Sequence, residues 1–231
     1  MKEKLKSNRI QWLADGREII DYPNVRKDAG LFSQNAGNIF RYNMMLGMMT
    51  WRDGDDPTSL FNEAIDDIIR YRDDLASRDM TTSKLPLSTA TILASLLDRQ
   101  SEFLLEPCEL DFAGDLFLDC HLAKRLQGVP PEPDVQKGFD RLHKLKRQAL
   151  AARSYKTYFD MLDMEAASAD IAGAIEAANA NYAARRKDAF YSGGPDIEGG
   201  GQDNNAAIDY RLAAIMKCRS VTATSLHGWR W

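Results

Sequence analysis

The sequence predicts an all-α protein, a bundle of about seven helices arranged as packed antiparallel pairs. Apolar residues recur at the 3.6-residue period of an amphipathic helix along most of the chain, and Pro- or Gly-rich breaks separate the periodic segments. The composition, 44% hydrophobic and 28% charged, is that of an ordinary globular protein. We expect a single domain over residues 1–231.

The first fifty residues predict one short helix and one long one. A short amphipathic piece spans residues 10–20, is interrupted by Gly16, and is expected to be a loosely docked arm. The apolar pattern of residues 25–50 fits a long helix. Glycines such as Gly37 and Gly47 each weaken that helix by up to about 1 kcal/mol relative to Ala, but their small size allows close helix packing.

The clearest helix lies within residues 51–78. Asp55 and Asp56 offer side-chain acceptors for its first N–H groups, and Pro57 fits its first turn. One side is apolar and the other is acidic. Burying the large apolar side chains would contribute roughly 10 kcal/mol, an upper value because unfolded chains already bury some surface. The apolar side consists of Leu60, Phe61, Ala64, Ile65, Ile68, Tyr71 and Leu75.

Two apolar helices are expected next, at residues 88–105 and 112–126. Ser88 is a suitable N-cap for the first. Pro107 ends it, because the residue before a proline disfavours the helical conformation. The second helix stops at Gly128 and the prolines that follow it.

The Pro-rich segment 129–133 offers an alternative to a single domain, in which it is a hinge between halves 24–128 and 134–231. After this segment, the pattern predicts a basic helix at residues 134–158 and an Ala-rich helix at residues 159–190. The expected bundle is therefore completed by long helices.

The last predicted helix begins at Asp203 or Asn204 and ends near Arg219. Apolar residues lie almost all round it, so we expect it to be largely buried. The aromatic tail that follows is expected to dock on the helices through one of its two tryptophans.

Charge is distributed unevenly along the chain, although the net charge is only -4. Residues 51–120 contain 16 acidic and 6 basic side chains, a balance of -10, whereas the segments on either side each carry +3. Such a local excess can steer a basic partner toward the protein. The alternatives are a solvated face or neutralisation by the basic helix at residues 134–158.

The acidic side of the helix within residues 51–78 is therefore the predicted partner-binding surface. We expect its partner to be a basic protein, because opposite charges accelerate encounter and determine orientation. The candidate residues are Glu63, Asp66, Asp67, Arg70, Asp73 and Asp74.

The cysteines and the lack of long apolar runs predict a reduced, cytoplasmic protein. Cys108, Cys120 and Cys218 are widely spaced and form no CxxC pair, so they predict neither a disulfide framework nor a zinc site. No apolar run reaches the ~18 residues of a membrane span, and the N-terminal residues lack the apolar core of a signal peptide. We therefore expect no membrane partner.

The motif search predicts a protein that is not an enzyme and that holds no metal or cofactor. The sequence contains no GxxxxGK[ST], GxSxG, HExxH or strand-linked GxGxxG pattern. His121, beside Cys120, cannot by itself build a zinc site. Few aromatic residues lie near the basic residues of the helix at 134–158, so we expect no nucleic-acid partner.

One enzymatic alternative remains open. Glu63 and Asp66, with Asp98 and Glu102 on another helix, resemble in outline the magnesium-binding carboxylates of all-α nucleotide pyrophosphohydrolases. Such a site needs carboxylates that face inward between helices, whereas Glu63 and Asp66 are predicted on the polar side. A structural or phage-type interaction protein that forms a homo-oligomer is a further alternative.

The segments WRDGDDP at 51–57 and DYRLAA at 209–214 give the chain a resemblance to bacterial all-α immunity proteins, which neutralise nuclease toxins of interbacterial competition. The first segment precedes the acidic helix, and the second begins a late helix after a Gly- and Asp-containing loop. The resemblance implies inhibition by binding, in which an acidic surface covers a basic toxin active site.

Overall fold

Helices make up the regular structure of the protein. The structure, a computed structural model, describes residues 2–80, 85–103, 115–144, 149–164, 171–187 and 209–221. These ranges contain ten α-helices, one 3-10 turn and no strand, so the predicted all-α class is confirmed. No helix of the described ranges is both long and apolar enough to cross a membrane.

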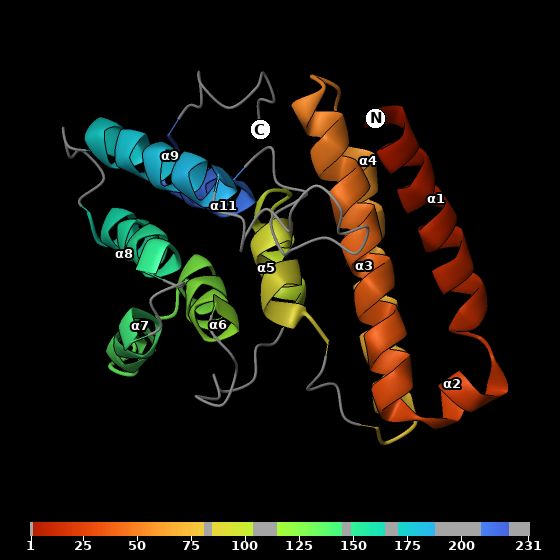
Figure 1. Cartoon of the computed structure of the whole chain (residues 1–231). Helices are drawn as coiled ribbons and strands as arrows, with labels where there is room; N and C mark the ends of the chain where they lie inside the picture. Colours follow the sequence, from red (N-terminus) through yellow and green to blue (C-terminus); the bar gives the residue numbers. More distant parts are fainter. Residues whose placement is uncertain are drawn as a thin grey trace. The chain divides into compact units, whose positions relative to one another are not determined.

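The described residues divide into two compact units. Those up to Ala90 belong to the first unit, and those from Thr91 onward belong to the second. The division falls within α5 (Leu87–Ser95), which Figure 1 shows as a short yellow helix. The Pro-rich segment 129–133, the predicted hinge, therefore lies inside the second unit.

The first unit is built on α3 (Ala29–Arg52). α1 (Lys2–Ile19) and α4 (Thr58–Ser77) both pack along α3, as Figure 1 shows, and α2 (Pro23–Lys27) connects α1 to α3. Trp51, near the end of α3, is a fully buried residue of this core. The unit is thus a small bundle with α3 in contact with the other three helices.

α3 and α4 are antiparallel, as the sequence predicted for its helix pairs. Phe61 near the start of α4 packs against Trp51 near the end of α3, with ring centroids 6.2 Å apart. Tyr71, further along α4, packs against Phe32 near the start of α3. A connection of five residues, in which Gly54 has a φ of +93°, allows this reversal.

α1 is longer and better packed than the sequence predicted. The expected piece at residues 10–20 belongs to a helix of 18 residues, and both Leu13 and Ile20 are buried. A Cβ on Gly16 would lie 3.1 Å from Cγ1 of Ile39, so the missing side chain lets α1 approach α3. The prediction of a loosely docked arm is wrong, because this glycine serves packing and does not interrupt the helix.

α4 confirms its predicted start and its predicted apolar face. The N–H of Thr58 donates a hydrogen bond of 2.9 Å to Asp56, one of the two expected capping residues. Leu60 is only partly buried, whereas Asp67, expected on the acidic side, is buried. The other expected apolar residues are buried as well: Phe61, Ala64, Ile65, Ile68, Tyr71 and Leu75.

In the second unit, α8 (Ala149–Asp163) packs against α6 (Asp115–Leu126), α7 (Val135–Lys144), α9 (Ile171–Lys187) and α11 (Tyr210–Cys218). α5 ends earlier than predicted, at Ser95, and Asp98 has a left-handed φ of +58°. α6 ends as predicted before Gly128, whose φ is +84°. A 3-10 turn, η1 (Gln100–Glu102), lies between α5 and α6.

The two long helices predicted for residues 134–158 and 159–190 are wrong. α8 runs without a break from Ala149 to Asp163 across the predicted boundary at residues 158 and 159, and α7 is a separate helix that packs against it. The rings of Phe139 of α7 and Phe159 of α8 meet with centroids 5.8 Å apart. α8 then ends at Asp163, and α9 is a separate helix that packs on it. Apolar residues keep a nearly continuous helical period from α7 through α8 to α9, so the sequence pattern did not indicate the two breaks between these helices.

α11 is buried on all sides, as the sequence predicted, from Tyr210 to Met216. Asp209 is its N-cap, and its carboxylate accepts a hydrogen bond of 3.2 Å from the N–H of Leu212. The capping residues expected at positions 203 and 204, and the aromatic tail with its tryptophans, lie outside the described residues.

A buried ion pair attaches α11 to α6. Arg211 donates two hydrogen bonds of 2.7 Å to Asp119, and Tyr155 of α8 donates a third bond of 2.6 Å to the same carboxylate. Tyr158 of α8 donates to Asp209. Burial alone would lower the pKa of Arg211, but Asp119, Tyr155 and Tyr210 together outweigh this effect and raise the pKa, so the guanidinium stays charged.

Cys120 of α6 is disulfide-bonded, so the prediction of reduced cysteines is wrong for this residue. Cys108 lies outside the described residues, whereas Cys218 is a free, exposed thiol at the end of α11. Spacing in the sequence did not reveal the bond, because disulfide formation depends on which cysteines the fold brings together.

Candidate functional site

The predicted partner-binding residues border two shallow concavities on the first unit. One concavity, of about 640 Å³, has Glu63, Asp66, Asp67 and Arg70 in its wall. The other, of about 440 Å³, has Arg70 and Asp74 in its wall. Arg17 of α1 lines both concavities, so basic side chains lie among the predicted carboxylates.

Asp67 is only 5% exposed and accepts hydrogen bonds from three helices. Its partners are Arg17 of α1 at 2.8 Å, Asn43 of α3 at 3.0 Å and Arg70 of α4 at 2.7 Å. The prediction that Asp67 lies on the solvated side is therefore wrong. The helical period gives the direction of a side chain from its own helix, but it does not show which neighbours cover that direction.

Two further predicted residues are paired with arginines near the N-terminus. Glu63 forms an ion pair with Arg17, while Asp74 binds Arg26 at 3.1 Å and also Arg78 of its own helix at 2.8 Å. Part of the acidic side of α4 is therefore neutralised by α1 and α2. The +3 balance of residues 1–50 was the signal in the sequence for this pairing.

The remaining predicted residues, Asp66, Arg70 and Asp73, are exposed. Asp66 and Asp73 are two turns apart on α4 and therefore point in similar directions. The side chain of Asp73 is 61% exposed and forms an ion pair of 2.8 Å with Arg72. Arg70 binds Asp67, but 63% of its own side chain is exposed. These three side chains are accessible to a partner without any change in the core.

Three of the four carboxylates of the pyrophosphohydrolase alternative form ion pairs with basic side chains. Glu63 is paired with Arg17, Asp98 binds Lys217 at 2.7 Å, and Glu102 binds Arg99 at 2.6 Å. Within the described ranges, no group of three or more His, Cys, Asp and Glu side chains could hold a metal ion. Nothing in these contacts favours that alternative.

The segment 209–214, one of the two that carry the resemblance to immunity proteins, has a role in the core. Asp209 caps α11, and Arg211 forms the buried pair with Asp119. Comparisons of the chain with protein-family models, curated proteins and solved structures found no match.

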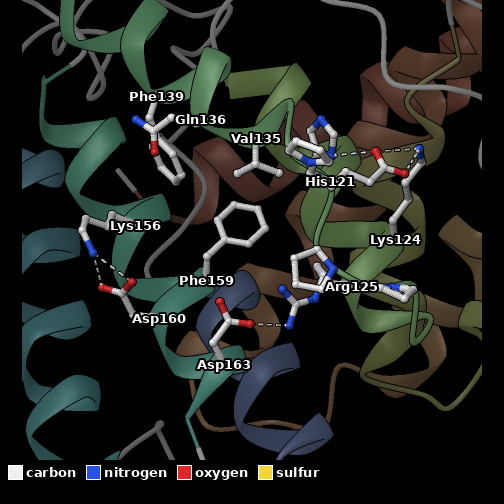
Figure 2. A pocket seen from close by; sticks show the side chains of 14 residues that line it. His121, Lys124, Arg125, Val135, Gln136, Phe139, Lys156, Phe159, Asp160 and Asp163 are labelled. Atoms are coloured by element: carbon white, nitrogen blue, oxygen red, sulfur yellow. Dashed lines mark hydrogen bonds and ion pairs between the residues drawn. The ribbon is translucent and has the colours of Figure 1, made fainter.

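A more enclosed pocket lies in the second unit, where α6, α7, α8 and the Pro-rich segment 129–133 meet (Figure 2). Its volume is about 390 Å³, which is in the range of small-molecule sites. Val135, Phe139 and Phe159 contribute an apolar wall, and the two phenylalanine rings meet edge to face. The prolines were the sequence signal for this pocket, but the sequence pattern indicated only a hinge.

Three ion pairs border this pocket, and Figure 2 shows them as dashed lines. The first joins α6 to the Pro-rich segment, the second joins α6 to α8, and the third lies within α8. They are Lys124 with Glu132 at 2.9 Å, Arg125 with Asp163 at 2.6 Å, and Lys156 with Asp160 at 2.7 Å. Opposite charges are thus distributed around an apolar wall.

His121 of α6 also lines this pocket, although it is only 2% exposed. Its Nδ1 lies 3.1 Å from Oε2 of Glu132, but neither ring nitrogen has a well-oriented hydrogen-bond partner among the described residues. Burial lowers the pKa of His121 below its usual 6.5; Glu132 opposes this effect and Lys124 adds to it. The ring is therefore neutral at pH 7.

Proposed function

We propose that the protein is a non-catalytic binding protein that captures a basic protein partner in the manner of an immunity-type inhibitor. Its recognition surface is the acidic edge of α4, defined as Asp66, Arg70 and Asp73. The supporting observation is that Asp66 and Asp73 are exposed on a helix whose opposite face is buried. Because the helix is held in place, its carboxylates lose little conformational freedom on binding.

Glu63, Asp67 and Asp74 have a different role in this proposal. All three are bound by arginines of neighbouring helices, and they hold α4 against α1 and α2. A partner that bound them directly would have to break these contacts. We therefore assign recognition to the acidic edge, which is smaller than the six-residue surface expected from the sequence.

The acidic edge would act mainly on the rate of association. Exposed carboxylates attract a basic surface over a Debye length of about 8 Å at physiological ionic strength. Affinity then comes from a few contacts that lose water on binding. The proposal also assigns the protein to the bacterial cytoplasm, in line with the immunity-type role.

Charge reversal on the acidic edge tests this proposal. The partner is first recovered with the wild-type chain from its native host, and association is then measured at several salt concentrations. The variant Asp66→Lys/Asp73→Lys should associate about 10-fold more slowly and with a weaker salt dependence. Its melting temperature should stay close to the wild-type value, because both positions are exposed.

The matched control is Asp140→Lys, which reverses an exposed carboxylate on α7. This variant should associate at the wild-type rate. If the double reversal leaves association and its salt dependence unchanged while the helical spectrum is intact, the acidic edge is not the recognition surface.

A further inference from the structure

The pocket between α6, α7 and α8 has an apolar wall of the kind that holds a hydrocarbon or aromatic group. Phe159 is buried, and Figure 2 shows its ring pointing into the space between Val135 and Arg125. Phe139 meets Phe159 edge to face, so the two rings offer both a face and an edge to a ligand. The prolines at 130, 131 and 133 add further apolar surface.

The ion pair between Arg125 and Asp163 has unused hydrogen-bonding capacity on both sides. A guanidinium has five N–H donors. With the described residues, Arg125 forms one hydrogen bond, of 2.6 Å, from its Nη2 to Oδ1 of Asp163. The second oxygen of Asp163 has no such partner among them. The side chain of Arg125 is only 15% exposed, so its position is restricted by packing.

The charges of the pocket wall cancel. Its cations are Lys124, Arg125 and Lys156, its anions are Glu132, Asp160 and Asp163, and the buried ring of His121 is neutral at pH 7. A purely anionic or cationic ligand would upset this balance, whereas a ligand with both charges preserves it. The adjacent charges of Arg125 and Asp163 match a carboxylate and an ammonium group that are carried by neighbouring atoms.

We propose that this pocket binds a small zwitterion with an apolar side chain, an α-amino acid of the aromatic or branched aliphatic class. The carboxylate of the ligand accepts hydrogen bonds from the free donors of Arg125. Its ammonium group donates to the second oxygen of Asp163, and its side chain packs against Phe139 and Phe159. This inference goes beyond the proposed function and does not depend on it, because every residue of the pocket belongs to the second unit.

Binding of L-phenylalanine to the full-length protein, followed by NMR titration, tests the inference. Three related molecules each lack one of the required groups: 3-phenylpropionate lacks the ammonium, 2-phenylethylamine lacks the carboxylate, and glycine lacks the side chain. L-Phenylalanine should bind saturably and at least about 10-fold more tightly than any of the three, since each loses one anchoring interaction.

Two substitutions locate the site. Asp163→Asn, at a half-exposed position, should weaken binding of L-phenylalanine about 10-fold and leave binding of 3-phenylpropionate unchanged. Val135→Trp should fill the pocket and abolish binding, while Asp140→Asn, on α7 but outside the pocket wall, should bind normally. Melting temperatures confirm that each variant is folded.

Three outcomes would overturn the inference. The first is the absence of a saturable response to L-phenylalanine. The second is equal binding of L-phenylalanine and 3-phenylpropionate, because the ammonium would then have no role. The third is wild-type affinity in a folded Asp163→Asn variant. None of these outcomes bears on the acidic edge of α4, so the failure of this inference and that of the proposed function can be distinguished.

Discussion

Asp66 and Asp67 are neighbours in the sequence, yet their carboxylates have opposite environments. Asp66 is exposed on the acidic edge, whereas Asp67 is buried and bound by Arg17, Asn43 and Arg70. The two positions therefore distinguish an exposed carboxylate, which we assign to recognition, from a buried one that stabilises the first unit.

Replacing Asp67 with Ala should lower the free energy of unfolding by about 2–4 kcal/mol, because Arg17 and Asn43 lose a shared buried acceptor. Asp66→Ala is the matched control and should change this free energy by less than about 0.5 kcal/mol, as is usual for exposed charges. Urea unfolding followed by circular dichroism measures both. Equal effects at the two positions would contradict the assigned burial.

His121 should make the stability of the protein depend on pH. Because its pKa is lowered in the folded state, the unfolded chain takes up a proton first as the pH falls below about 6.5. The folded state therefore loses stability between pH 7 and pH 5, and the contribution is fully lost only below the folded pKa. In His121→Gln this contribution is absent, so the decrease should be smaller. Denaturant unfolding of the wild-type protein and of His121→Gln at pH 7 and pH 5 measures the two decreases in stability. Identical decreases would show that His121 does not cause the pH dependence.

At the scale of helices, two glycines have different roles: close packing requires one of them, whereas the other only weakens its helix. A Cβ on Gly47 of α3 would lie 2.4 Å from Cε1 of Phe61, a ring buried between α3 and α4. A Cβ on Gly173 of α9 would have no described heavy atom within 4 Å. Both glycines weaken their helices locally, but only Gly47 is required for packing.

We therefore expect Gly47→Ala to destabilise the protein by roughly 1 kcal/mol. The gain in helix propensity of about 1 kcal/mol is outweighed by overpacking, which typically costs 1–3 kcal/mol. Gly173→Ala should instead stabilise by about 0.5–1 kcal/mol. Thermal unfolding of the two variants provides the measurement, and a higher melting temperature for Gly47→Ala would show that α3 and α4 can move apart.

The attachment of α11 depends on the pair of Asp119 and Arg211. Arg211→Met should lower the free energy of unfolding by about 3–5 kcal/mol, because Asp119 is left charged and buried. The double variant Asp119→Leu/Arg211→Met should lose less than the sum of the two single variants, since it leaves neither charge unpaired. Denaturant unfolding of all four proteins gives the coupling, and additive losses would mean that the pair does not act as a unit.

Helix ends were predictable where a capping residue or a left-handed glycine marks them. Asp56 accepts a hydrogen bond from the first N–H of α4, and Gly128 follows α6, as expected. The breaks between α7, α8 and α9 were missed, because residues 134–190 keep a nearly continuous apolar period. The rings of Phe139 and Phe159 meet only because α7 packs against α8, and this contact is not visible in a local pattern.

At the scale of the whole molecule, the distribution of cysteines bears on the compartment in which the protein works. Among the three cysteines, Cys120 is in a disulfide and Cys218 is free. Disulfides persist mainly in oxidising environments, whereas the immunity-type proposal assigns the protein to the cytoplasm. The oxidation state in the host therefore tests that part of the proposal.

We expect one reactive thiol per chain in protein that is denatured without reductant, and three after reduction. The reason is that one disulfide occupies two of the three cysteines. Titration with a thiol reagent measures both numbers, provided that the cells are lysed into acid, which prevents later oxidation without blocking the free thiols. Three reactive thiols before reduction would contradict the disulfide and agree with a reducing compartment.

The division into two units was not visible in the sequence. It falls within α5, whereas the Pro-rich segment, which looked like a boundary, forms part of a pocket wall. The charge excess of residues 51–120 was visible, but its partial neutralisation by Arg17 and Arg26 was not. Composition records how much charge a segment carries and does not record which segments meet.

The sequence by itself determined the all-α class, the apolar face of α4 and the burial of α11, because helical periodicity and capping are local properties of the chain. Only the tertiary structure decided that Asp67 is buried, that α7 and α8 are separate, and that ion pairs and prolines enclose a pocket. These features depend on contacts between distant segments, such as Arg17 with Asp67, and no local pattern specifies them.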